Sequence, residues 1–145
     1  IICIRFSIVA KWAEQQGYAF TNYTNLSTLP EVYEKLSEEI SRVNESLPDA
    51  QKINKFLLLY KELDADDGEL TRTRKVRRGV IADKYGDIIS AIYDDKEQVD
   101  IDTVVVFQDG TKTRIQTQLM VKSLVDNSAS NKASNTNEET QRRAS

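Results

Sequence analysis

The chain has 145 residues, 39% of them hydrophobic and 30% charged, and a net charge of −3. That length suits one ordinary domain plus a tail, and the composition excludes a largely disordered chain or one built from membrane spans. The acidic balance argues against general nucleic-acid binding, the absence of histidine excludes imidazole-based catalysis and metal binding, and a single cysteine excludes an intrachain disulfide.

The first residues form a continuous apolar run, 1–4 and on toward Phe6, which is typical of a strand buried on both faces. Cys3 in this run is expected to be a buried, inert thiol. Because the run begins without methionine and without a basic leader, we expect an N-terminally truncated chain. Ser7 is a candidate cap for a short amphipathic helix that ends at Gly17.

Residues 18–25 are rich in Thr, Asn and Tyr and are expected to form a connection. Ser27 or Thr28 could then cap a helix with Pro30 in its first turn and Pro48 after its end. Apolar residues recur there at steps of three and four residues and form one stripe: Leu29, Val32, Tyr33, Leu36, Ile40, Val43 and Leu47. Trp12, on the apolar face of the preceding helix, is expected to pack in the core rather than to bind a ligand.

The second half of the chain begins with an apolar run at 55–61, which predicts an interior strand. Apolar spacing then predicts an amphipathic helix over 81–94, and two β-rich runs at 99–107 and 112–121 predict a hairpin. Asp109-Gly110 between the two runs is a strong turn signal.

We therefore predict an α+β fold in which a small mixed sheet packs with amphipathic helices and carries a C-terminal β-hairpin. Residues 1–122 are expected to form the domain. Residues 123–145 have almost no large apolar side chains, so they cannot offset the entropy of ordering and are expected to form a disordered, low-complexity tail.

An acidic turn that changes abruptly into a basic run occupies residues 63–78. The basic part places five cations in seven residues, among them Lys75, Arg77 and Arg78, and Thr71 and Thr73 add hydroxyl donors. Two interpretations stay open on charge alone: an anion site suited to phosphate or carboxylate, or a solvated helix start balanced by the preceding acids. The acids lack the spacing of a calcium loop, so a metal site is not favoured there.

The order of elements and several sequence blocks resemble the C-terminal part of AMP-forming long-chain-fatty-acid CoA ligases, including the bubblegum-like branch. The blocks are Lys11-Trp12-Ala13-Glu14, Leu26-Ser27, Pro30-Glu31-Val32-Tyr33, Phe56-Leu57-Leu58-Leu59, Glu62-Leu63, and the run from Glu69 to Arg78. The resemblance extends from Ile1 to about Val121. Its most specific part is the last block, in which Lys75 stands where adenylate-forming enzymes keep their catalytic lysine.

Three positions depart from that pattern. Arg74 stands where the wider superfamily has a glycine before the lysine, and Arg72 replaces the proline that often separates the two threonines in this branch. Arg5 replaces an acidic residue that tends to follow the first strand. The first two departures concern the geometry of the loop, and the third concerns one contact.

The resemblance implies a two-step reaction in which fatty acid and Mg-ATP form an acyl-adenylate and coenzyme A then displaces AMP. Lys75 would be catalytic in the first step, and Thr73, Arg77 and Arg78 are candidate contacts to nucleotide phosphate. It also implies that ATP and Mg²⁺ bind mainly to a large N-terminal domain of the same parent chain, which is the expected partner. The expected location is the cytoplasm, with peripheral membrane association of the parent enzyme open, and the chain alone should be inactive.

A non-catalytic module that uses the same fold to bind an anion or a protein partner is the alternative. The resemblance leaves open whether Arg77 and Arg78 contact phosphate, the large domain or solvent.

Overall fold

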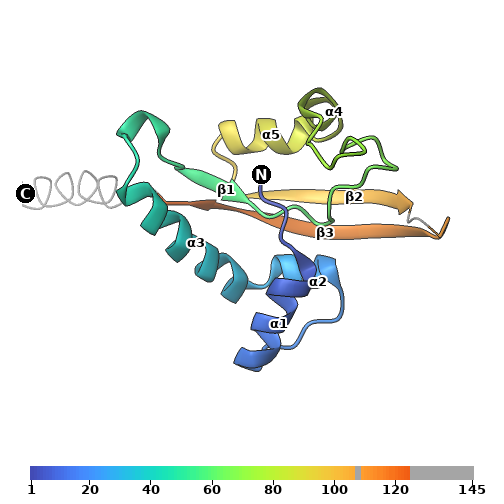
Figure 1. The fold of residues 1–145 in the computed structure, drawn as a ribbon, viewed down its shortest axis with the longest axis horizontal. Coiled ribbons are helices and arrows are strands. Elements are labelled where there is room, and N and C mark those ends of the chain that lie inside the picture. The colour runs from blue at the N-terminus through green and yellow to red at the C-terminus, as the bar shows by residue number, and fades with distance from the viewer. Residues whose placement is uncertain (107–108, 125–145) are drawn as a thin grey trace, which may run out of the picture.

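The computed structural model describes residues 1–106 and 109–124, and the expected tail lies almost entirely outside these residues. Helices and a small antiparallel sheet make up the described fold (Figure 1), which confirms the α+β class. In chain order the elements are α1 (Phe6–Gln16), α2 (Tyr23–Thr28), α3 (Pro30–Glu45), the 3₁₀ turn η1 (Asp49–Gln51), β1 (Lys55–Leu57), α4 (Arg78–Lys84), α5 (Gly86–Tyr93), β2 (Gln98–Val106) and β3 (Lys112–Ser123).

The three strands pair in the order β1-β3-β2, and both pairings are antiparallel. Leu57 lies opposite Val121, and Val99 lies opposite Leu119. The predicted hairpin is therefore confirmed. Gly110 has a φ of 81°, a left-handed conformation that glycine adopts without steric cost, and this explains the strength of the turn signal. β3 continues to Ser123, one residue beyond the expected end of the domain.

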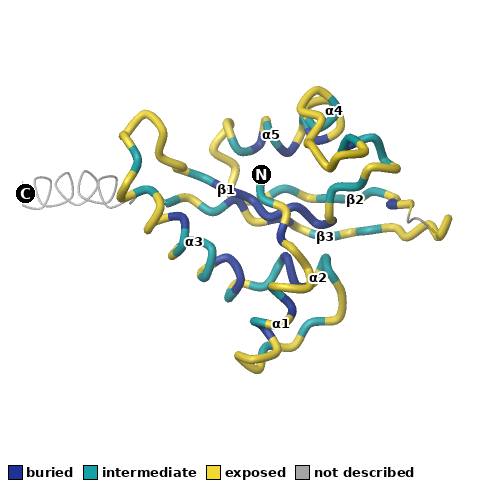
Figure 2. Tube along the Cα trace, viewed as in Figure 1, coloured by how far each residue is buried: buried dark blue, intermediate teal, exposed yellow. Residues whose placement is uncertain are grey.

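Helices cover both faces of the sheet (Figures 1 and 2): α1, α2 and α3 lie on one side, and α4 and α5 lie on the other. The buried residues after Lys55 pack against the helices on both faces of the sheet. Phe56 and Leu58 pack with the α1–α3 layer, whereas Leu57 and Leu59 pack with α5, and all four are at most 1% exposed. Alternate residues of a strand point to opposite faces, so this run is buried on both sides, as its continuous apolar sequence predicted.

The expected N-terminal strand is the first prediction that the structure corrects. Within the expected strand only Ile2 pairs, in a single parallel bridge with Leu58. This bridge is the only parallel pairing among the described residues. On that side β1 therefore has no long neighbouring strand. Ile4 is buried, but Cys3 is exposed, contrary to expectation. The nearby chain still shields its sulfur, and this desolvation raises the pKa of the Cys3 thiol to about 11, which keeps it protonated near neutral pH.

The helix starts also differ from prediction. α1 begins at Phe6 after the extended residue Arg5, so Ser7 lies inside the helix and is not its cap. The end at Gly17 is confirmed by its left-handed conformation, with a φ of 78°. Part of the expected connection instead forms α2, whose first turn is capped where the side chain of Asn22 accepts a hydrogen bond from the Asn25 amide at 2.8 Å.

Ser27 and Thr28 belong to α2 and do not cap α3, which begins with Pro30 at its first position. The apolar stripe of α3 packs in the core as far as Ile40, but Val43 near the end of the helix is 53% exposed. Trp12 is half-buried and packs beside Tyr18 at the edge of the α1–α3 core, in line with a packing role.

The helix predicted over 81–94 is two helices, α4 and α5, separated at Tyr85. Tyr85 has a φ of −114° and a ψ of 23°, outside helical values, and Gly86 starts the next helix. The break directs the Tyr85 side chain into the protein, where it is 3% exposed. No helix in the described part of the chain is long and apolar enough to cross a bilayer.

Candidate functional site

Residues 64–69 form a compact acidic turn between β1 and the basic run. The amide of Asp66 donates to the Asp64 carboxylate at 3.0 Å, and the amide of Glu69 donates to the Asp64 carbonyl at 3.1 Å. Gly68 has a φ of 74°, a conformation that favours glycine. The carboxylates of Asp64, Asp67 and Glu69 in this turn therefore accept hydrogen bonds or ion pairs within the protein.

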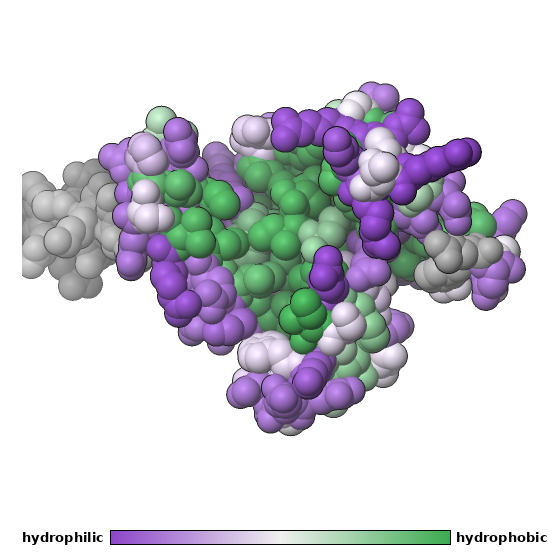
Figure 3. Space-filling model, viewed as in Figure 1, coloured by the Kyte–Doolittle hydropathy of each residue, from purple (hydrophilic) through white to green (hydrophobic). Residues whose placement is uncertain are grey.

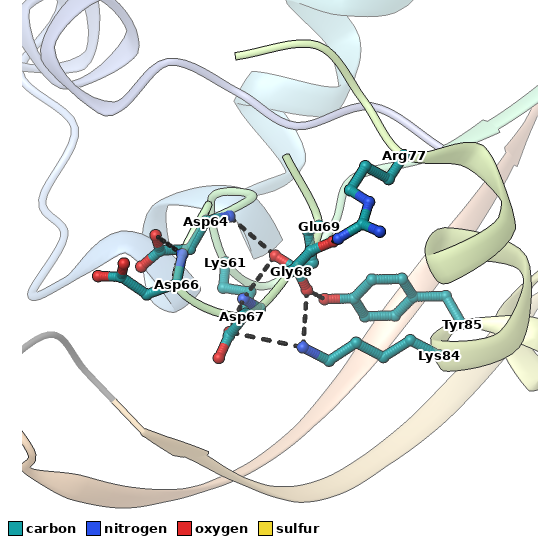
Figure 4. A network of polar contacts seen from close by, with 9 residues as sticks. All are labelled: Lys61, Asp64, Asp66, Asp67, Gly68, Glu69, Arg77, Lys84 and Tyr85. Carbon is teal, nitrogen blue, oxygen red and sulfur yellow. Dashed lines mark hydrogen bonds and ion pairs between the residues drawn. The ribbon is translucent and has the colours of Figure 1, made fainter. Parts of the chain in front are cut away.

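The carboxylate of Glu69, which is fully buried, lies at the centre of the site (Figure 4). Its Oε2 accepts hydrogen bonds from Lys61 Nζ at 2.9 Å and from the Asp64 amide at 2.8 Å. Its Oε1 accepts a hydrogen bond from the Tyr85 hydroxyl and pairs with Lys84 Nζ at 2.9 Å. We call the six residues Lys61, Asp64, Asp67, Glu69, Lys84 and Tyr85 the Glu69 cluster.

Asp67 completes the cluster, because its carboxylate pairs with Lys61 at 2.7 Å and with Lys84 at 3.5 Å. Burial alone would raise the pKa of Glu69, but hydrogen bonds from Tyr85, Lys84, the Asp64 amide and Lys61 outweigh it and lower that pKa. Likewise, burial disfavours the charged form of Lys61, yet its two carboxylate partners raise its pKa. Glu69 and Lys61 therefore both stay charged across the neutral pH range.

The residues that follow form a tight hairpin, 70–76, which we call the lysine hairpin. Leu70 and Val76 pair in an antiparallel bridge, and the Thr71 amide donates to the Lys75 carbonyl at 2.8 Å. The turn closes with a hydrogen bond from the Arg74 amide to the Thr71 carbonyl at 2.8 Å. Arg74 has a φ of 61°, so a non-glycine residue occupies a left-handed position here.

The hydroxyl of Thr71 stabilises this turn further. It accepts a hydrogen bond from the Lys75 amide at 3.0 Å and lies 3.1 Å from the hydroxyl of Thr73. Two of the predicted site residues, Thr73 and Lys75, thus belong to one small hairpin. Their main chain is fixed by hydrogen bonds within seven residues of sequence.

The basic side chains are exposed on this hairpin and on the start of α4. Lys75 is exposed and makes no ion pair with any residue that the structure describes. Arg77 precedes α4 as its N-cap, with Nη1 3.5 Å from the Gly68 carbonyl, and Arg78 is the exposed first residue of the helix. Only part of the basic run therefore lies at a helix start, and the rest lies on the hairpin before it.

An open cleft of about 1360 Å³ lies beside the hairpin, between α2, the segment after β1 and the end of the β2–β3 hairpin. Arg72 and Arg74 line it together with Tyr23, Lys61 and Arg114. Lys75 lies outside it. Figure 3 shows mainly hydrophilic side chains around this loop region, whereas apolar side chains gather over β1 between α3 and α5.

A family model described as the AMP-binding enzyme C-terminal domain matches residues 20–97, which is more than half of the chain and includes the whole Glu69 cluster and the lysine hairpin. The chain belongs to this family. The resemblance noted from the sequence blocks is thereby confirmed.

The curated relatives of this AMP-binding enzyme C-terminal domain carry the name long-chain-fatty-acid CoA ligase. The chain is 36% identical to the ligase FadD15 of Mycobacterium tuberculosis over 69 aligned residues. This alignment covers 48% of the chain and 12% of the relative. The chain is 42% identical over 65 residues to the ligase ACSBG2 of Xenopus laevis, 44% of this chain and 9% of the relative. It is 35% identical over 69 residues to the ligase heimdall of Drosophila melanogaster, 47% of this chain and 10% of the relative.

These alignments span about a tenth of the length of each relative. No solved structure matches the chain. The exposed cations of the domain, Lys75, Arg77 and Arg78, fit the phosphates of a nucleotide. Within the described residues, no group of three or more acidic or cysteine side chains could hold a metal ion.

The structure also brings together three residues whose contacts the sequence pattern did not predict. The sequence pattern presents Glu69 only as one acid in a charged turn, Lys61 only as the charged end of the 55–61 run, and Tyr85 only as one member of the apolar stripe of the 81–94 helix. Lys61 directly follows a buried strand, and a lysine that is buried there needs an acidic partner. In the structure that partner is Glu69, eight positions later. The cleft depends on α2, which was not predicted.

Proposed function

We propose that this chain is the C-terminal domain of an AMP-forming long-chain-fatty-acid CoA ligase and that Lys75 is its catalytic lysine in the adenylation step. Membership of the family of AMP-binding enzyme C-terminal domains and the printed names of the relatives support the reaction class. The observation that carries the assignment of Lys75 is its placement. It projects from a hydrogen-bonded hairpin, exposed, and makes no ion pair within the described chain.

The chemistry of adenylation explains why such a lysine is useful. The fatty-acid carboxylate attacks the α-phosphorus of ATP, a phosphorus–oxygen bond to the acyl group forms, and the bond to the departing pyrophosphate breaks. Negative charge accumulates on the phosphorus oxygens and on the leaving group. An ammonium group placed between the carboxylate and the α-phosphate stabilises that charge as a hydrogen-bonding point charge. Lys75 acts in this role and not as a general base.

The second step makes different demands. The thiol of coenzyme A attacks the acyl carbonyl, the acyl–phosphate bond breaks, and AMP leaves. No pyrophosphate departs in this step, so a charge placed for the first step contributes less. Because Lys75 lies on an exposed hairpin of a small domain, a rotation of this domain between steps can present and withdraw it, as loops on rigid scaffolds often do.

The test of the proposal measures the two half-reactions separately in the full-length ligase that contains this domain. Lys75→Ala should slow fatty-acid-dependent exchange of pyrophosphate into ATP by about 100-fold or more, the scale expected when one preorganised charge is lost. Thioester formation from supplied acyl-adenylate should change by only a few-fold. The matched control is Lys11→Ala, because Lys11 is an exposed lysine on α1, away from the hairpin.

Equal losses in both half-reactions, or an unchanged exchange rate, would contradict the role given to Lys75. An unchanged rate would favour the alternative, a non-catalytic module that binds anions or a protein partner. Thr73, Arg77 and Arg78 remain proposed phosphate contacts. Arg77 and Arg78 are exposed beside Lys75, and the Thr73 hydroxyl lies within the same hairpin.

A further inference from the structure

The carboxylate of Glu69 joins three parts of the chain, the farthest of which, Tyr85, lies 16 positions away. Lys61 follows β1, the Asp64 amide belongs to the acidic turn, and Tyr85 lies between α4 and α5. Both carboxylate oxygens are used, and no side-chain polar atom among the buried described residues lacks a partner. A buried charge that loses one such partner is strongly destabilised, so these segments are held in one arrangement.

The main chain of Glu69 then continues into the lysine hairpin. The carbonyl of Glu69 accepts a hydrogen bond from the Arg77 amide at 2.9 Å, which closes the base of the hairpin. The next pair inward is the Leu70–Val76 bridge, and the one after that is the bond from the Thr71 amide to the Lys75 carbonyl. A short ladder therefore connects the buried carboxylate to the main chain of Lys75.

The hairpin has little other support. Residues 72–78 are exposed, and Val76 is 52% exposed, so side-chain burial contributes little to holding the ladder. The left-handed residue Arg74 adds conformational cost. The main chain of Lys75 is therefore ordered mainly by hydrogen bonds within the hairpin and by the bond between Glu69 and Arg77 at the start of the ladder.

We propose that Glu69, held by Lys61, Lys84 and Tyr85, is a positioning residue that sets the place of Lys75 through the main chain of the lysine hairpin. This inference rests on the proposed function of Lys75. Glu69 is buried and does not itself contact the substrate or the nucleotide. Its contribution to catalysis lies in geometry, because a displacement of about 1 Å in a reacting group can cost on the order of 100-fold in rate.

The first experiment measures amide hydrogen exchange in the 145-residue chain and does not depend on catalysis. Glu69→Gln keeps the size of the side chain but removes its charge, and its amide group meets hydrogen-bond donors. We expect the amides of Thr71, Arg74 and Arg77 to exchange at least 10-fold faster. The Val121 amide, which bonds to the Glu97 carbonyl, should keep its protection. Asp83→Asn, an exposed acid on α4, is the control.

The second experiment is a double-mutant cycle on the adenylation rate of the full-length ligase. Glu69→Gln should lower the pyrophosphate-exchange kcat about 10-fold with a smaller change in KM for ATP. The same change made on the Lys75→Ala background should have almost no further effect, because a misplaced lysine and an absent one are equivalent. Tyr85→Phe removes one hydrogen-bond donor to Glu69 and should lower kcat by a smaller factor, again only when Lys75 is present. This variant replaces Glu69→Gln in the cycle if Glu69→Gln does not fold.

The outcomes separate this inference from the proposed function. If Lys75→Ala leaves adenylation unchanged, the proposed function fails and this inference fails with it. If Lys75→Ala slows adenylation but Glu69→Gln lowers the rate by the same factor on both backgrounds, only the positioning role is overturned. Unchanged exchange at Thr71, Arg74 and Arg77 in Glu69→Gln would also overturn it.

Discussion

Arg74, which departs from the family pattern, has a backbone angle that favours glycine. Its φ of 61° lies in the left-handed region, where a β-carbon is costly and glycine is favoured. The superfamily pattern places a glycine before the lysine, and here the turn keeps the glycine conformation although the residue is arginine. Arg74 therefore occupies a backbone position at which glycine would carry no steric cost.

This angle leads to a stability prediction for the hairpin residue itself. Arg74→Gly should raise the free energy of unfolding by about 0.5–1 kcal/mol relative to Arg74→Ala, because both changes remove the guanidinium but only glycine removes the steric cost of positive φ. Urea unfolding of the two variants measures the difference. An alanine variant as stable as the glycine variant would show that no strain is relieved at this position.

Lys75 and Glu69, the proposed catalytic and positioning residues, differ in how far the sequence could predict them. Lys75 lies in a contiguous block, so its role could be proposed from neighbouring residues alone. Glu69 acquires its role from Lys61 and from Tyr85, which is 16 positions away and reaches it only because α4 and α5 are separated at that point. Periodicity placed Tyr85 in the apolar stripe of one continuous helix, and so it did not indicate that the Tyr85 hydroxyl bonds to Glu69.

Among the elements, those with long and regular patterns were predicted well. The apolar stripe of α3, the double-sided burial of Phe56 and Leu57, and the β2–β3 hairpin all follow from spacing and a turn signal. α2 was missed because it is only six residues long and is fixed by the Asn22 cap and by burial of Leu26. The N-terminal strand was overestimated because an apolar run does not reveal how many residues find a pairing partner.

The Glu69 cluster, which joins the acidic turn to α4 and α5, leads to a pH prediction at this scale. The pKa of Glu69 and that of Asp67 are lowered in the folded chain, in both cases against the opposing effect of burial. The unfolded chain therefore binds more protons at acidic pH, and the stabilisation is present above the ordinary carboxyl pKa of about 4 and lost as pH falls through the lower folded values. Lys61, whose pKa is raised, keeps its contribution until pH rises above about 10.4.

Unfolding by urea over a series of acidic pH values tests this prediction. In the unsubstituted chain the free energy of unfolding should fall steeply below about pH 4.5, and in Glu69→Gln the dependence should be flatter because one titrating carboxyl is gone. Asp83→Asn should keep the steep dependence. A Glu69→Gln curve parallel to that of the unsubstituted chain would show that Glu69 does not contribute through its charge.

At the scale of the whole molecule, the sheet separates two packed layers with different tasks. The α1–α3 layer buries Phe56 and Leu58 and completes the fold, whereas the other layer carries α4, α5 and the lysine hairpin. Lys75 is exposed on this second layer and is not among the residues that line the cleft. The surface that would complete the reaction site is therefore expected on another part of the ligase.

This arrangement predicts that the 145-residue chain makes no acyl-CoA when it is incubated alone with fatty acid, ATP, Mg²⁺ and coenzyme A. Mass spectrometry of the products should match a reaction without protein, while a full-length ligase under the same conditions gives acyl-CoA. Turnover by the chain at a rate near that of a full-length ligase would show that the domain carries a complete site.

The most direct test of the central claim asks whether the Lys75 side chain meets the acyl-adenylate. Lysines of the full-length ligase are acetylated with a water-soluble reagent, with and without a non-hydrolysable acyl-adenylate analogue, and the modification of each lysine is measured by mass spectrometry. Lys75, exposed in the free domain, should be protected at least 10-fold by the analogue, while Lys11 is modified equally in both samples. Equal modification of Lys75 with and without the analogue would contradict the account.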